Sequence, residues 1–308
     1  MLFSLTKPNF PNAAIGIESD RVSAIALSRT RSSYSIKQAA TIALPPNVIE
    51  PSFLEVNITD PLEFRASLEA AVQSSGLMNQ KRWSIALPSN SARSAILTLE
   101  AEPAAKQETE EILDWKAEQT FGAPASQLRI SRHKISPNRE GRPRYFATAI
   151  SLGVIDEYET MFENLGWKAG LILPRAVGEA NWLVKRADKA DSLLISEQDD
   201  GFTALLLRGD EPSVVRTVTC LPAEIDDEVY RLLMFYNDRF GSSVNGGYLD
   251  RVLLIGSGLA PAKILQIASE ALGRSLQILR PEDVGLSLPE SSFNFDEIAA
   301  PAALASLA

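Results

Sequence analysis

The chain has 308 residues, 45% of them hydrophobic and 22% charged, which is the composition of a globular protein long enough to bury two domain cores. Thirty lysines and arginines stand against 39 aspartates and glutamates, and the net charge of −9 repels phosphate backbones, so the composition excludes nucleic acid as an expected partner. No run of about 18 consecutive apolar residues occurs, so the sequence predicts no membrane-spanning helix.

The first part of the chain reads as three strands, a helix and a fourth strand. Within residues 13–44, the runs AAIGIE, VSAIALSR and YSIKQAATIAL are apolar or alternate between apolar and polar residues, as β-strands do. A helix is expected over 61–75, because Asp60 can cap it, Pro61 can occupy its first position and Gly76 can end it. The run RWSIALP predicts the next strand.

The middle of the chain follows a different plan. ARSAILTLE predicts a strand, KQETEEILDWKAEQT a charged helix, and QLRISRHKI and PRYFATAISL a hairpin. A helix over 154–165, the strand KAGLILP and a helix over 175–187 follow.

The opening plan then returns. DSLLIS, GFTALLLRG and PSVVRTVTCL predict three strands within 191–221, an amphipathic helix is expected over 223–240, and RVLLIGSG predicts a strand that runs into a glycine turn. A further helix begins at Pro261 and stops at Gly273. Two copies of this order indicate a duplicated α/β core. The tail over 284–297 reads as a loop, and the final APAALASLA is expected to dock as a closing helix.

Several of these segments resemble the PilM family of type IV pilus assembly proteins, which have an actin-like ATPase fold. GIE at 16–18 stands where the family's first strand reads roughly G-I-D-I-G, and WKAEQ at 115–119 is similar to its W-E-A-E-Q helix end. The stretch YFATAISLGVIDEYETMFENLGWKAGLILPRAVGEAN resembles the strand, helix, strand and helix that lead out of the family's first domain. RVLLIGSGLAPAKILQIASEALG resembles its L-x-G-G-G turn and the following helix, so the likeness covers nearly the whole chain as a pattern of segments.

The resemblance implies an α/β fold of the actin-like, ribonuclease H-like type, related to that of the cell-division protein FtsA. This fold is duplicated, with two domains and a small α+β subdomain inserted in the first. Domain I would comprise residues 13–187 and 295–308, with the insert at about 90–152, and domain II would comprise residues 190–283.

The resemblance also implies a function without chemistry. PilM relatives are cytoplasmic and bind a short amino-terminal segment of the inner-membrane protein PilN, which connects them to PilO-type proteins and the pilus machine. We therefore expect a cytoplasmic scaffold, peripheral to the inner membrane through its partners, with a peptide groove between the insert and the first core. The run MLFSLTKPNFPN agrees with this location, because it lacks the apolar core and cleavage site of a secretory signal. The oligomeric state is left open.

The residues that would hold a nucleotide in an actin-like fold depart from the expected pattern. Its two phosphate hairpins need small residues that let backbone N–H groups approach, and a carboxylate that holds hydrated Mg²⁺ or positions water. The first hairpin, GIESDRVSAIAL, has no glycine in its turn, and the second, LLISEQDDGFTALLL, has acidic residues where small ones belong, which would repel a triphosphate. The turn at 256–258 keeps glycines but also fits a plain strand-to-helix turn. We predict no cofactor and a vestigial nucleotide site consisting of Glu18, Ser19, Gly256, Ser257 and Gly258.

Two alternatives stay open. A working ATPase or kinase would hold ATP and Mg²⁺ through Glu18, Asp20, Asp199 and Asp200. The other alternative is the cytoplasmic part of a type II secretion protein of the GspL kind, because those proteins resemble PilM in fold and also lack good ATP motifs.

A basic hairpin stands out on this acidic protein. Within residues 129–144, six cations are opposed only by Glu140. Charged strand faces are often simply solvated. The functional interpretation is a docking patch for an acidic partner or for anionic lipid head groups, near which each Lys or Arg adds about 1 kcal/mol. This basic patch consists of Arg129, Arg132, Lys134, Arg139, Arg142 and Arg144.

Cysteine and histidine are nearly absent, which excludes many catalytic chemistries. The single cysteine, Cys220, and the single histidine, His133, cannot form a disulfide framework or a zinc site of the Cys/His type. His133 lies in a turn-rich stretch typical of a solvated residue, and Cys220 ends a β-rich run in which it is expected to pack as a small hydrophobic residue. The sequence therefore predicts no catalytic residue and no metal site.

Overall fold

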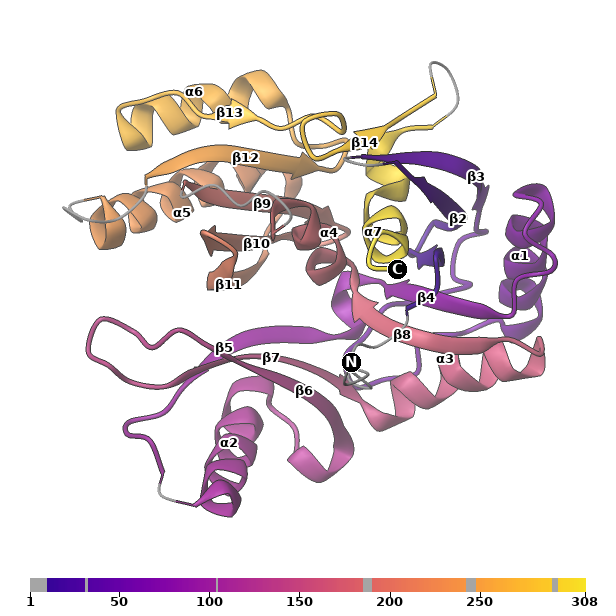
Figure 1. Cartoon of the computed structure of the whole chain (residues 1–308), viewed down its shortest axis with the longest axis horizontal. Coiled ribbons are helices and arrows are strands. Elements are labelled where there is room, and N and C mark those ends of the chain that lie inside the picture. Colours follow the sequence, from indigo (N-terminus) through magenta and orange to yellow (C-terminus); the bar gives the residue numbers. More distant parts are fainter. Residues whose placement is uncertain (1–9, 31–32, 104, 185–189, 242–247, 290–292) are drawn as a thin grey trace, which may run out of the picture.

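The described part of the chain folds around three β-sheets (Figure 1). The computed structural model describes residues 10–30, 33–103, 105–184, 190–241, 248–289 and 293–308. The predicted strands and helices are found at their expected places in these ranges, and none of the helices there is long and apolar enough to span a membrane.

The first sheet has six strands in the order β14-β3-β2-β1-β4-β8. β1, β2 and β3 pair antiparallel, whereas β4 and β8 run parallel to β1 on its other side. Helices α1 and α3 cover one face and bury an apolar cluster that includes Ile15, Phe64 and Tyr158. The elements are β1 (Ala13–Ile17), β2 (Arg21–Arg29), β3 (Tyr34–Ala43), α1 (Pro61–Ser74), β4 (Arg82–Leu87), α3 (Leu152–Asn164), β8 (Lys168–Pro174) and β14 (Leu286–Ser287).

The second sheet repeats this arrangement. Its order, β11-β10-β9-β12-β13, matches β3-β2-β1-β4-β8 strand for strand, with three antiparallel strands followed by two parallel ones. The predicted duplication is therefore confirmed. Helices α5 and α6 cover the outer face. The elements are β9 (Asp191–Gln198), β10 (Gly201–Arg208), β11 (Glu211–Thr219), α5 (Ile225–Phe240), β12 (Leu249–Ile255), α6 (Pro261–Leu272) and β13 (Gln277–Ile278).

The third, smaller sheet belongs to the middle of the chain and has the order β5-β7-β6. Helix α2 packs on one face of it through Leu113, Ala117 and Phe121, and Phe53 completes this core. In Figure 1 this insert lies beside the second sheet, below it in the view. The elements are β5 (Arg93–Thr98), α2 (Lys106–Phe121), β6 (Leu128–Ile135) and β7 (Arg144–Ser151).

Helices α4 (Arg175–Val184) and α7 (Phe295–Ala305) lie between the two large sheets and share one core with both (Figure 1). The predicted closing helix is thus present, but it begins earlier than expected, because the Asn294 side chain caps it by accepting the Asp296 N–H. The prediction of a loop over 284–297 is wrong in part, since this stretch also contains the short strand β14.

Two predicted boundaries and the amino-terminal run need comment. Helix α3 begins at Leu152 rather than at residue 154. The predicted helix over 175–187 is described as far as Val184, and its last residues lie outside the described ranges. Most of the amino-terminal run MLFSLTKPNFPN also lies outside them.

A buried hydrogen bond at the start of β9 makes the stability pH-dependent. The Tyr236 hydroxyl donates to Asp191 at 2.9 Å, and burial, together with this carboxylate, raises the pKa of Tyr236 to about 12. The ordinary tyrosine pKa is about 10, so the folded state holds the phenolic proton more tightly than the unfolded chain does. The contribution of Tyr236 to the free energy of unfolding is complete below pH about 10 and is lost as the pH rises toward 12.

We therefore expect the difference in free energy of unfolding between the wild type and Tyr236→Phe to shrink over that pH window. Urea denaturation at several pH values measures it. A difference that stays constant would contradict the assignment.

Candidate functional site

The turns of the two duplicated hairpins face each other across a small cavity. The β1–β2 turn contributes Glu18 and Ser19, and the β9–β10 turn contributes Gln198 and Asp199. The cavity has a volume of about 20 Å³, which is room for little more than one water molecule. The structure therefore brings the two predicted phosphate hairpins together but leaves little space between them.

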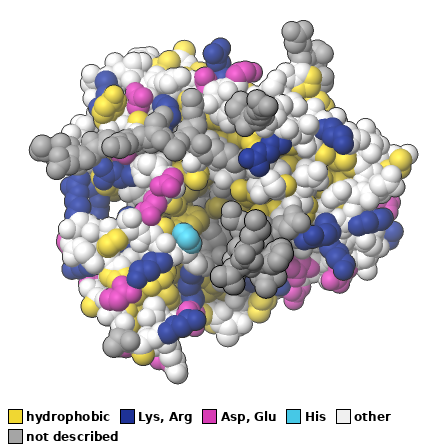
Figure 2. Space-filling model, in the orientation of Figure 1, with side chains coloured by type: hydrophobic (Ala, Val, Ile, Leu, Met, Phe, Trp, Pro, Cys, Tyr) yellow, Lys and Arg dark blue, Asp and Glu magenta, His cyan; other side chains and the backbone are white. Residues whose placement is uncertain are grey.

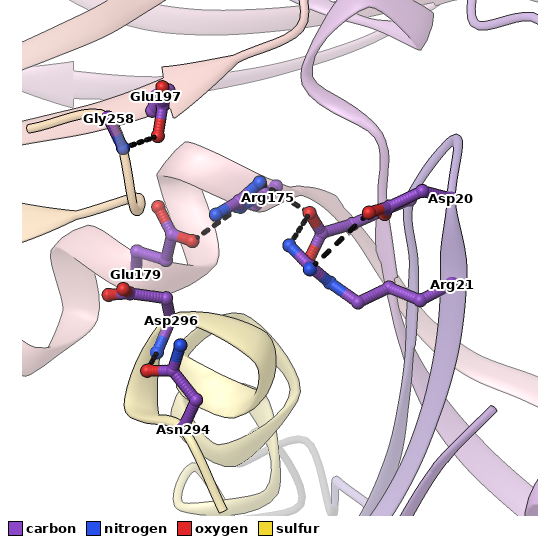
Figure 3. Close-up of polar contacts among 9 residues, drawn as sticks. Asp20, Arg21, Arg175, Glu179, Glu197, Gly258, Asn294 and Asp296 are labelled. Carbon is purple, nitrogen blue, oxygen red and sulfur yellow. Dashed lines mark hydrogen bonds and ion pairs between the residues drawn. The ribbon is translucent and has the colours of Figure 1, made fainter. Parts of the chain in front are cut away.

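A buried cluster of charged side chains lies beside this cavity (Figure 3). Arg175, the first residue of α4, is only 7% exposed. Its guanidinium contacts Glu18 Oε2 at 2.7 Å and Glu179 Oε1 at 2.7 Å, and Arg21 reaches the same Glu18 oxygen at 2.7 Å. Glu18, the carboxylate that would hold Mg²⁺ in the ATPase alternative, thus forms ion pairs with two arginines.

The cluster shifts the protonation equilibria of its members. Burial raises the pKa of Glu18, although Arg175 and Arg21 oppose this shift. Burial alone would lower the pKa of Arg175, but the carboxylates of Glu179 and Glu18 outweigh it and raise the pKa above its ordinary value. Arg175 is therefore a permanent buried cation at this position.

The glycine turn after β12 is occupied by a side chain of the same protein. Glu197 Oε2 accepts the backbone N–H of Gly258 at 2.8 Å (Figure 3). A Cβ added to Gly258 would lie 2.1 Å from Glu197 Oε1, and one added to Gly256 would lie 2.2 Å from Glu197 Cβ. These glycines are therefore needed for the close approach of Glu197, and Ser257 between them is exposed to solvent.

The four carboxylates of the ATPase alternative are not assembled into a metal site. Glu18 and Asp199 line the same cavity, but Asp20 is exposed beside Arg21, and Asp200 accepts a hydrogen bond from Asn90 at 3.0 Å. In the parts of the chain that the structure describes, no group of three or more His, Cys, Asp or Glu side chains is placed to hold a metal ion.

The two residues of nucleophilic type lie apart from this cavity. Cys220 packs against the core of the second sheet, and burial and nearby carboxylates, chiefly that of Glu228, raise the pKa of its thiol. His133 is exposed on β6.

Four cations of the basic patch are paired with carboxylates. Figure 2 shows basic and acidic side chains interspersed on this face of the molecule. Many of the partners come from α2, α3 and the loop before α2, so sequence position alone did not reveal them. The pairs are Arg129 with Glu159, Arg132 with Glu110 and Asp114, Lys134 with Glu102, and Arg142 with Glu100 and Glu140. Docking of a membrane or acidic partner on these four stays a prediction.

The other two cations, Arg139 and Arg144, lie at the far end of the same hairpin. They line a different cavity, together with Arg208 and Arg239 of the second sheet and α5. Sequence reasoning did not predict that Arg208 and Arg239 join them, because these two arginines come from segments far from the hairpin.

An apolar groove runs between the insert and the first sheet. It has a volume of about 420 Å³ and lies where the peptide groove was predicted. β8 forms one wall and is the edge strand of the first sheet, with β4 as its neighbour. Its apolar lining includes Ile130, Phe146, Ile150, Leu171 and Leu173.

No protein-family model and no curated protein matches the sequence, whereas solved structures match the fold. A chain from a PilM–PilN type IV pilus biogenesis complex superposes with a TM-score of 0.73 over 98% of each chain, at 14% identity. A Bacteroides thetaiotaomicron protein of unknown function with an actin-like ATPase fold gives a TM-score of 0.49, at 12% identity over 97% of this chain and 98% of that one. The cytoplasmic domain of EpsL, an inner-membrane component of the Vibrio cholerae type II secretion system, also gives 0.49, at 11% identity over 95% and 94%. The chain therefore has the actin-like α/β fold, and the resemblance to PilM is confirmed at the level of that fold.

Proposed function

We propose that this chain is a scaffold of type IV pilus assembly that docks an extended amino-terminal segment of a PilN-type inner-membrane protein. The observation that carries the proposal is the apolar groove beside the edge strand β8, on a chain that shares its fold with a member of a PilM–PilN complex. The protein would act on the cytoplasmic side of the inner membrane, held there by its partner.

The groove suits an extended peptide for two physical reasons. An edge strand offers unpaired backbone N–H and C=O groups, to which a peptide can add as a further strand. Alternate side chains of such a peptide point to the same side, where Ile130, Phe146 and Leu171 offer apolar contacts.

The proposal includes a degenerate nucleotide site, so the protein would be a pseudo-ATPase. Arg175 places a fixed positive charge beside the cavity between the two hairpins and engages Glu18. Glu197 accepts a hydrogen bond from the Gly258 N–H and adds negative charge at the glycine turn. Together they leave a triphosphate with little room and few donors.

The domain division expected from the sequence is part of the same proposal. Domain I comprises residues 13–187 and 295–308, with the insert at about 90–152, and domain II comprises residues 190–283. The separate sheet and core of the insert support this division.

The docking proposal predicts a loss of peptide affinity when a charge enters the groove. Ile130→Glu and Leu171→Glu should each weaken binding of the amino-terminal peptide of a PilN-type protein at least about tenfold, since the carboxylate must be desolvated against apolar side chains. Leu62→Glu is the matched control, because Leu62 is 81% exposed on α1, and it should leave the affinity unchanged. Fluorescence anisotropy with a labelled peptide measures the effect.

Thermal unfolding of each variant confirms that it is folded. Equal affinity of all three variants would overturn the assignment of the groove. Binding of the corresponding segment of a type II secretion partner in place of the pilus peptide would favour the GspL-like alternative.

The degenerate-site proposal predicts no turnover of Mg-ATP, and titration calorimetry in which Glu18→Gln leaves any binding of Mg-ATP unchanged. The cavity between the hairpins is too small and its donors are engaged by Glu18 and Glu197. Micromolar binding accompanied by turnover that disappears in Glu18→Gln would establish the ATPase alternative instead.

A further inference from the structure

A polar cavity of about 560 Å³ separates the insert from the second sheet, away from both the hairpin cavity and the apolar groove. The β6–β7 hairpin contributes Arg139 and Arg144 to its wall, and the end of β10 and the end of α5 contribute Arg208 and Arg239. Four arginines thus converge on one cavity of an otherwise acidic protein. The volume lies within the range of small-molecule sites, about 300–1,000 Å³.

The wall formed by the second sheet holds its arginine in a fixed position. Arg208 pairs with the buried carboxylate of Asp191 at 3.2 Å, and Asp191 also accepts the Tyr236 hydroxyl. The Arg208 guanidinium lies 5.0 Å from the centre of the Phe240 ring, and that of Arg139 lies 5.9 Å from the same ring. Stacking on a shared aromatic ring orients both guanidinium groups and leaves their positive charges in place.

The other two carboxylates of this cavity have partners outside the group of four arginines. Glu211 accepts the Ser136 N–H at 2.9 Å, and Glu140 pairs with Arg142 at 3.0 Å. Among the residues that the structure describes, Arg144 makes no ion pair, and its Nε donates instead to the Ser136 carbonyl at 2.9 Å.

The Arg239 guanidinium likewise has no carboxylate partner among the described residues and lies 5.8 Å from the Phe235 ring. Burial lowers the pKa of Arg144, and the charges of Arg208 and Arg239 add to this shift while Glu211 opposes it. Positive charge is therefore crowded here beyond what the surrounding carboxylates offset, and an anion would relieve it.

We propose that this cavity binds a small polyphosphate, either inorganic or carried by a nucleotide, with its phosphate oxygens bridging arginines of the insert and of the second sheet. The planar guanidinium fork suits phosphate oxygens, which accept two parallel hydrogen bonds. Four arginines contributed by two walls suit a ligand with several phosphate groups better than one with a single phosphate.

A ligand in this position would couple the insert to the second sheet. Binding to the folded state alone raises the unfolding temperature by mass action. The insert also forms one wall of the apolar groove, so the same ligand would hold that wall in place. The polyphosphate site itself does not depend on the proposed peptide function.

Titration calorimetry with inorganic tripolyphosphate, without divalent metal and at low salt, tests the proposal. We expect saturable binding to the wild type, weakened at least about tenfold in both Arg239→Gln and Arg144→Gln, because each loses a charged hydrogen-bond donor to phosphate. Arg231→Gln is the matched control, since Arg231 lies on the same helix, is exposed and pairs with Glu228 away from the cavity. Its affinity should stay within about twofold of the wild type.

A nucleoside triphosphate titrated under the same conditions distinguishes the sources of the polyphosphate. Nucleotide binding that is also lost in Arg239→Gln assigns the nucleotide to this cavity. Absence of tripolyphosphate binding, or an equal loss in Arg231→Gln, would each overturn the proposal. Arg239 is exposed, so its variant should fold normally, which thermal unfolding checks. Failure of the peptide assay alone would count against the docking function and not against this site.

Discussion

Arg175→Met should lower the free energy of unfolding by about 3–5 kcal/mol, the usual cost of removing one partner from a buried ion pair. Arg175 is 7% exposed and Glu179 is fully buried, so the substitution leaves the Glu179 carboxylate without the guanidinium that it contacts. Glu18 keeps Arg21 but loses its second arginine. Urea denaturation of the purified protein measures the change.

The pH dependence of this variant gives an independent test. Burial already raises the pKa of Glu18 above its ordinary value of 4.5, and removal of Arg175 takes away the main opposing charge. A carboxyl group whose folded-state pKa is raised contributes stability that is complete below its unfolded pKa and is lost as the pH rises through the folded one. The deficit of Arg175→Met should therefore be smaller near pH 4 than at pH 7.5.

Two further variants serve as controls for Arg175→Met. Arg280→Met removes an exposed arginine from a surface pair and should change stability by no more than about 0.5 kcal/mol. Arg175→Met/Glu179→Leu removes both charges and should recover most of the loss, because an apolar pair needs no counter-charge. If Arg175→Met were as stable as the wild type at neutral pH, the role given to this cluster would be contradicted.

Removal of α7 should abolish folding. Ile298 and Leu304 are fully buried, and losing their burial alone costs about 1.5–3 kcal/mol each. The indole N–H of Trp182 also loses the Ala299 carbonyl that accepts its hydrogen bond at 2.9 Å, at a cost of about 1–3 kcal/mol. These losses are comparable with the entire stability of a typical domain, about 5–15 kcal/mol. A chain ending at Asn294 is therefore expected to be insoluble or digested rapidly by protease.

A milder variant keeps this prediction measurable. Leu304→Ala should lower the free energy of unfolding by about 2–5 kcal/mol, because the cavity it leaves is enclosed by α4 and the sheets. Leu62→Ala, at a position that is 81% exposed, should change it by less than about 0.5 kcal/mol. Similar values for the two variants would show that α7 is dispensable to the core.

Local sequence signals predicted most of the fold. The alternating runs at 13–44 and 191–221 gave the strands, because the period of a half-buried strand is visible in any short window. Asp60 caps α1 as expected, accepting the N–H groups of Leu62 and Glu63 at 3.1 Å each. The same plan repeated in both halves indicated the duplicated topology that the two large sheets show.

The site depended on contacts that no local window contains. Arg175 and Glu18 are 157 residues apart in the sequence, so no residue near either of them indicated their ion pair. Glu197 fills the glycine turn from another strand. For the basic patch a signal did exist: Glu110 and Asp114 are four residues apart on α2 and so share a helical face, which could have indicated an acidic stripe opposite the hairpin.

The position of α7 has a consequence for biosynthesis. The second sheet and its outer helices α5 and α6 are complete once residue 278 has been made, whereas the face of β1 opposite α1 and α3 is covered only when residues 295–305 have emerged. Gly16 of β1 lies directly under Pro301, so close that an added Cβ would meet the proline ring at 2.9 Å. During translation the later half can therefore mature first, while the earlier half exposes an apolar surface until the helix arrives. A ribosome-bound chaperone would therefore be able to contact that surface for longer than any other part of the chain.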